Sequence, residues 1–184
     1  MLVPESDTLS ADGWLASATH TPSPNCDARP EGRAIELIVI HNISLPPGVF
    51  DGNAVIELFS NQLDWDADPY YQDMRGLEVS AHFLIRRDGS LIQFVPCSLR
   101  AWHAGVSKWQ TCERCNDFSI GIELEGTDDQ AFTEAQYVTL MPLVRQLKQA
   151  YPIQSVVGHS DIATGRKTDP GPHFDWHRLH EQTG

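Results

Sequence analysis

The chain has 184 residues, of which 41% are hydrophobic and 9% aromatic, and its formal net charge at pH 7 is -12. This length suits one domain with a single core, and we expect a polar tail over residues 1–13 before one domain over residues 14–184. The acidity argues against nucleic acid or an anionic membrane surface as the main partner, because both need a basic surface. An acidic substrate is compatible if arginine and lysine side chains reverse the field within one cleft.

The N-terminus, MLVPESDTLSADGW, has neither the basic start nor the apolar segment of a secretory signal. The most apolar short run, residues 35–40, is too short to cross a bilayer. We therefore expect a cytoplasmic protein that does not insert into a membrane, and we infer no obligate protein partner.

The first half of the chain predicts a strand, a short helix and a hairpin. Residues 34–43 (AIELIVIHNI) are apolar on both faces, which indicates a central strand covered on two sides. Residues 54–63 place Val55, Leu58 and Phe59 on one side of a short helix. Residues 79–96 are typical of a hairpin with a two-residue Asp-Gly turn.

The second half predicts a loop over residues 99–110 and a strand over residues 118–126. Thr133 with Gln136 forms a capping box before an amphipathic helix, in which Pro142 predicts a kink or an irregular turn. A short strand, Ser155–Val157, follows. Strands mixed with helices and an antiparallel hairpin predict an α/β (α+β) domain, with a central mixed sheet flanked by helices.

Three side chains stand where a strand ends or a rigid loop begins. His41 ends the first strand, His159 follows the last one, and Asp169 lies in the proline-rich segment KTDPGP. Two imidazoles and one carboxylate are a set that catalytic zinc uses, with water in the fourth position and its pKa lowered towards about 7. The alternative is a histidine at the core edge and an aspartate that caps a stiff turn. Spacing alone leaves both open.

Glu123 and Lys167 are candidates for proton transfer and charge stabilisation. Glu123 lies on the strand face opposite Ile120, Ile122 and Leu124, where it is either a solvated side chain or a general base. Lys167 is either a solvated loop lysine or a cation that stabilises the oxyanion of a tetrahedral intermediate.

Other polar and aromatic groups could contact a ligand. Arg114 could hold a carboxylate by a bidentate contact. Trp102 and His103 offer a flat face and a polar tip for a sugar or peptide, unless Trp102 only fills the core edge. Arg114 lies between Cys112 and Cys115, whose spacing is incidental or serves a thiol function; without a secretory signal, the cysteines are expected to be reduced.

Six segments of the sequence, taken in chain order, resemble the AmpD-type cytoplasmic 1,6-anhydro-N-acetylmuramyl-L-alanine amidases. The resemblance runs from about Trp14 to Arg178. It implies the fold shared by zinc N-acetylmuramoyl-L-alanine amidases and peptidoglycan recognition proteins, with helices on the faces of a mixed sheet. The segments are VIHNISLPPG (Val39–Gly48), SAHFLIRRDG (Ser80–Gly89), RAWHAGVS (Arg100–Ser107), RCNDFSIGIELEGTD (Arg114–Asp128), GHSDIA (Gly158–Ala163) and RKTDPGPHFDW (Arg166–Trp176).

The resemblance implies cleavage of the lactyl amide between an anhydro-muramyl sugar and L-alanine, in muropeptides imported during cell-wall recycling. The same step would keep the inducers of β-lactamase expression low. The implied roles are zinc binding by His41, His159 and Asp169, proton acceptance by Glu123, stabilisation of the transition state by Lys167, and substrate contact by Asn42 and Arg114.

The chain departs from the family pattern at Glu78, where we expect arginine, in the Cys112–Cys115 pair, and in a longer N-terminal tail. Two other functions stay open beside the zinc amidase. One is a non-catalytic muropeptide-binding module on the same fold, and the other is a redox protein built on the two cysteines.

Overall fold

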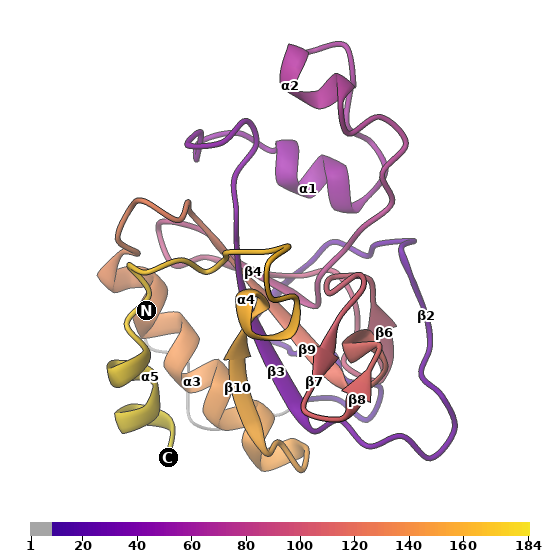
Figure 1. Cartoon of the computed structure of the whole chain (residues 1–184), viewed down its shortest axis with the longest axis vertical. Coiled ribbons are helices and arrows are strands. Elements are labelled where there is room, and N and C mark those ends of the chain that lie inside the picture. The colour runs from indigo at the N-terminus through magenta and orange to yellow at the C-terminus, as the bar shows by residue number, and fades with distance from the viewer. Residues whose placement is uncertain (1–8) are drawn as a thin grey trace.

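The computed structural model describes residues 9–184, and its centre is a six-stranded sheet (Figure 1). Neighbouring strands pair in parallel except β4 and β5, which are antiparallel, so the predicted mixed sheet is confirmed. In spatial order the strands are β1 (Thr19–His20), β5 (Leu91–Gln93), β4 (Phe83–Ile85), β9 (Ser119–Glu125), β3 (Leu37–Ile43) and β10 (Ser155–Gly158).

One face of the sheet is covered by α3 (Glu134–Ala150) and α5 (Trp176–Thr183) (Figure 1). The predicted capping box is present at the start of α3: Thr133 accepts from the Gln136 backbone, and the Gln136 side chain accepts from the Thr133 backbone. Pro142 lies inside α3 and does not end it. The alternate residues of β3, β4 and β9 that face these helices form the main core, namely Ile38, Ile40, Phe83, Ile85, Ile120, Ile122 and Leu124.

The opposite face carries His41, Ser119 and Glu123 and is covered mostly by short elements. Residues 99–110 were expected to be a loop, but they contain β6 (Leu99–Ala101), which pairs with β2 (Cys26–Ala28), and β7 (Lys108–Trp109), which pairs with β8 (Cys112–Glu113). A 3-10 turn, Cys115–Asp117, and α4 (His159–Ile162) complete this layer.

Residues 44–79, here called the arm, connect β3 to β4 and lie beyond the carboxyl end of β3 (Figure 1). The arm contains α1 (Ala54–Phe59) and α2 (Pro69–Gln72). As predicted, Val55, Leu58 and Phe59 of α1 are buried, and they pack in one cluster with residues of β4 and β5.

β4 and β5 form the predicted hairpin, but its turn is longer than the predicted two residues. Arg86 N donates to Ser90 O over 3.0 Å, so three residues rather than two make the loop. Gly89 ends that loop with φ +84°, a left-handed conformation that glycine adopts without steric cost. The Asp-Gly pair therefore located the turn, but the pair alone did not set its length.

The expected tail lies mostly among residues 1–8, outside the described residues. Of its remainder, Gly13 is joined to the body, because its carbonyl accepts hydrogen bonds from Cys97 N at 3.0 Å and Gln93 Nε2 at 2.8 Å. Within residues 9–184, no helix has the length and apolarity needed to span a bilayer.

Candidate active site

The pairing of β3 with β9 places His41 beside Glu123. The two residues are direct partners in the parallel register, on the sheet face opposite α3, and Glu123 Oε1 lies 4.0 Å from His41 Nδ1. The sequence suggested that His41 leaves the core at the end of its strand. Instead, β3 continues to Ile43 and His41 is 1% exposed.

The end of β10 brings the other two candidate ligands to the same place. β10 pairs with β3 and ends at Gly158, so His159 opens α4 beside His41. Residues 163–172, here called the ligand loop, then bring Asp169 back to the two histidines. The Asp169 carbonyl accepts a hydrogen bond from Ser160 N over 3.0 Å. A Cβ on Gly158 would lie 2.8 Å from Cδ of Pro170, so glycine lets the loop pack closely.

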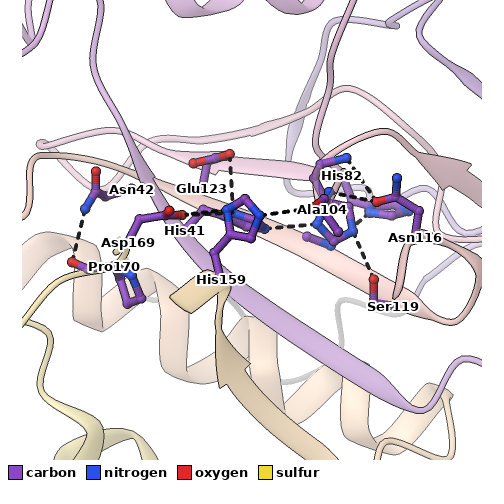
Figure 2. Close-up of polar contacts among 12 residues, drawn as sticks. His41, Asn42, His82, Ala104, Asn116, Ser119, Glu123, His159, Asp169 and Pro170 are labelled. Carbon is purple, nitrogen blue, oxygen red and sulfur yellow. Dashed lines mark hydrogen bonds and ion pairs between the residues drawn. The ribbon is translucent and has the colours of Figure 1, made fainter. Parts of the chain in front are cut away.

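Three ligand atoms form an almost equilateral triangle (Figure 2). His41 Nδ1, His159 Nδ1 and Asp169 Oδ2 lie 3.1 Å from one another in all three pairs. Among the described residues this is the group of histidine, cysteine and acidic side chains that meets the spacing for a metal ion. Two imidazole nitrogens and one carboxylate oxygen are the donor set of a catalytic zinc site, so these residues fit zinc.

The second ring nitrogen of His159 supports the same interpretation. His159 Nε2 lies 3.1 Å from the carbonyl oxygen of Ala104, which can only accept, so Nε2 carries the proton. The lone pair of His159 Nδ1 is then directed into the triangle. Metal-binding histidines commonly hold their second nitrogen in this way.

The protonation of this group suits cation binding. Burial lowers the pKa of His41 to about 4, so its ring is neutral at pH 7. Burial raises the pKa of Asp169, but its close contacts with His159 and His41 outweigh that effect and hold the pKa below its ordinary value. A neutral imidazole and an ionised carboxylate are the forms that bind a metal.

Glu123 is enclosed rather than solvated, since it is 7% exposed. Its Oε2 is buried and has no hydrogen-bond partner in the part of the chain that the structure describes. Burial raises the pKa of Glu123 well above its ordinary value, Asp169 raises it further, and Lys167 opposes the shift. A buried carboxyl with an unpaired oxygen beside a candidate metal is suited to proton transfer.

The triangle and Glu123 line a cleft of about 500 Å³. Its walls come from the carboxyl ends of the strands, from the arm and from the ligand loop, which contributes the exposed Lys167 and Arg166. Lys167 is close enough to Glu123 to oppose the rise of its pKa, whereas Arg166 Nη2 donates to the carbonyls of Ala104 and Val106. These two cations line the cleft together with three carboxylates, so positive charge is available there at individual side chains.

Asn42, on β3, also lines the cleft, and a hydrogen bond joins it to the ligand loop. Its Nδ2 donates to Asp128 Oδ1 at 2.7 Å and to the Pro170 carbonyl at 3.1 Å. Asp128 had no role predicted from the sequence. Its only signal was its position just after a buried strand, at the edge of the sheet where ligands commonly bind.

The other residues predicted to contact substrate lie at different places in the structure. Arg114 is exposed and lines a second cavity, of about 1000 Å³, which shares Arg166 with the cleft. Trp102 directs its indole Nε1 to Asp27 Oδ1 at 3.3 Å and is not among the described residues that line the cleft. His103 lies in the cleft lining, is 8% exposed, and uses both ring nitrogens within the protein.

Residues 31–172, which include the triangle, Glu123 and Lys167, match the family described as N-acetylmuramoyl-L-alanine amidase. The chain belongs to this amidase family. The resemblance inferred from the six sequence segments is therefore confirmed.

Known relatives agree with this amidase assignment. The 1,6-anhydro-N-acetylmuramyl-L-alanine amidase AmpD of Enterobacter cloacae is 54% identical over 174 residues, which cover 94% of this amidase and 93% of the relative. A crystal structure of a selenomethionine AmpD derivative has a TM-score of 0.93 at 52% identity and covers 96% of this chain and 100% of that one. The expected fold class is thereby confirmed.

A more distant neighbour was solved with a ligand. It is the amidase AmiD of E. coli in complex with the substrate anhydro-N-acetylmuramic acid-L-Ala-D-gamma-Glu-L-Lys, with a TM-score of 0.60 and 30% identity. The match covers 96% of the present amidase and 65% of the AmiD chain.

Proposed function

We propose that this amidase hydrolyses the amide between 1,6-anhydro-N-acetylmuramic acid and L-alanine in muropeptides, using zinc held by His41, His159 and Asp169. The observation that supports it most is the triangle of ligand atoms, 3.1 Å on each edge, with the buried Glu123 beside it. That site lies in a chain 54% identical to an enzyme named for this reaction.

Bound zinc would polarise the substrate carbonyl and make a water molecule more acidic. Glu123 then accepts a proton from the attacking water and delivers it to the leaving amide nitrogen. Its raised pKa suits this exchange, because a carboxyl with an ordinary pKa returns a proton poorly at neutral pH. The Lys167 ammonium stabilises the oxyanion that develops on the carbonyl oxygen.

The anionic peptide of the substrate is expected to extend towards the second cavity. Arg166 lines both cavities, and Arg114 lies farther along the same surface. We propose that these two guanidinium groups bind the carboxylates of the peptide. Asn42 lines the cleft, and we propose that it contacts the substrate near the reacting amide.

We place this reaction in the cytoplasm, on muropeptides imported during cell-wall recycling, where it lowers the concentration of muropeptides that induce β-lactamase. The first experiment measures bound zinc and release of peptide from anhydro-muramyl tripeptide, for the wild type and for Asp169→Ala. Glu181→Ala, which removes an exposed carboxylate on α5, is the control.

We expect about one zinc per chain and peptide release in the wild type and the control, and loss of both in Asp169→Ala. Saturable muropeptide binding without zinc or peptide release would contradict the proposal, and would identify a recognition module.

A further inference from the structure

His103 lies directly behind the metal-site histidine His41. Its Nδ1 is 2.9 Å from His41 Nε2, and its Nε2 is 3.0 Å from the hydroxyl of Ser119 on β9. Figure 2 shows His41 and Ser119 at the two ends of this row of polar contacts. The contacts therefore run from the candidate metal site into the interior of the protein.

The direction of these hydrogen bonds follows from the metal site. If His41 presents the lone pair of Nδ1 to the triangle, its proton is on Nε2 and is donated to His103 Nδ1. His103 must then carry its own proton on Nε2 and donate it to Ser119 Oγ. The tautomer of His103 thus determines whether His41 can present a ligand nitrogen.

The backbone on both sides of His103 is held by one side chain. Asn116 Oδ1 accepts from His103 N at 3.1 Å and from Ala104 N at 2.8 Å. The carbonyl of the same Ala104 accepts the proton of His159 Nε2. One short segment therefore orients both histidines of the triangle, His41 through a side chain and His159 through a carbonyl.

The sheet leaves a space for the His103 ring. A Cβ on Gly121 would lie 2.4 Å from His103 Cγ, closer than any Cβ contact allows. Gly121 lies two residues before Glu123 on β9 and has no side chain to displace the ring. The His41 and His103 rings meet edge to face, with centroids 5.1 Å apart and planes at 86°.

We propose that His103 is a positioning residue of the metal centre: it accepts the His41 Nε2 proton and thereby orients His41 Nδ1 towards the metal. This inference rests on the proposed zinc function. It replaces the sequence-based expectation that His103 contacts substrate, because both of its ring nitrogens are committed within the protein.

The test compares zinc affinities, measured by competition with a chromogenic chelator. His103→Leu removes the acceptor, and we expect roughly 10- to 100-fold weaker zinc binding. His103→Asn keeps an oxygen near the position of Nδ1, and we expect it to recover most of the affinity. His180→Leu, at an exposed site on α5, is the control. Thermal unfolding of each metal-free variant checks its fold.

A second measurement needs no variant. In zinc-loaded wild type, long-range nitrogen–proton NMR spectra should show His103 protonated at Nε2 and not at Nδ1. A proton on Nδ1, or zinc affinity unchanged in His103→Leu, would overturn the positioning role while the zinc function stands. A wild type that binds no zinc would overturn both, so the two failures are distinguishable.

Discussion

Asn42 donates a hydrogen bond from Nδ2 to Asp128 Oδ1 over 2.7 Å, which joins β3 to the segment after β9. The other carboxylate oxygen of Asp128 accepts from the hydroxyl of Thr168, in the ligand loop. Asp128 thus connects the rigid sheet to the loop that carries Lys167 and Asp169. Its carboxylate is well placed to hold the loop and is not one of the three triangle residues.

Replacing Asp128 by alanine should loosen the ligand loop. Two hydrogen bonds are lost, so we expect the free energy of unfolding to fall by about 1–3 kcal/mol and zinc binding to weaken. Thermal unfolding and chelator competition measure the two effects. The control is Asp129→Ala, at an exposed position next along the chain. Equal behaviour of the two variants would show that Asp128 does not hold the loop.

Glu123→Ala should lose turnover and retain zinc. Loss of an acid–base group typically costs about 100-fold or more in rate, and Glu123 is not one of the three triangle residues. The measurements are kcat on anhydro-muramyl tripeptide and zinc content. Unchanged turnover in a zinc-loaded variant would remove Glu123 from the mechanism.

Glu123→Gln should stabilise the metal-free protein at neutral pH. The folded-state pKa of Glu123 is raised, so ionisation disfavours the folded state as pH rises above the ordinary value of the carboxyl, about 4.3. Glutamine cannot ionise, so the gain in Tm should increase with pH from about 5 to about 8. Unfolding with a chelator present measures it, with Glu181→Gln as the exposed control. A gain independent of pH would argue against this cause.

Lys167→Met should reduce kcat by about 100- to 1000-fold, the range for a lost group that stabilises an oxyanion. Zinc content should not change, because the ammonium lies outside the triangle. Lys148→Met provides a matched control, since Lys148 lies on α3 and is not among the described residues that line either cavity. A similar small loss in both variants would reduce Lys167 to a general electrostatic role.

Replacing Cys112 and Cys115 together by serine should keep kcat within about threefold, since burial raises the pKa of Cys115 and leaves little thiolate at pH 7. Neither cysteine is among the described residues that line the cleft. The assay is the tripeptide reaction with zinc content as control. Loss of turnover in a folded, zinc-loaded variant would indicate a thiol role.

The main strands of the sheet were predictable from sequence because each carries a local pattern, whereas the two- and three-residue strands β1, β2, β6, β7 and β8 were not predicted. The apolar run before His41 and the alternation around Glu123 identified β3 and β9. Their pairing is not local, however, and only the register shows that His41 and Glu123 are direct neighbours. The burial of Glu123 likewise depends on which residues cover that face of β9. The alternation of apolar and polar residues along the strand does not reveal them.

The surroundings of the site were harder to predict than its ligands. Trp102 and His103 are adjacent in sequence and looked like a binding pair, yet Trp102 contacts Asp27 and His103 contacts His41. Asp128 had no distinctive motif, and its role arises from contacts with residues about 40 and 86 positions away. Such contacts join residues far apart in sequence and depend on the topology of the fold, so they cannot be predicted from residue spacing along the chain.

The cleft has walls that come from separate parts of the chain, and the arm supplies one of them. The triangle and Glu123 are presented by the strands and the loops at their ends, whereas Tyr70, Met74 and Leu77 reach the cleft from the arm. The arm is one continuous excursion between β3 and β4. If the proposed function holds, substitutions in the arm would reshape one wall of the cleft without touching the triangle or Glu123. Substrate choice and hydrolysis could then change independently in evolution.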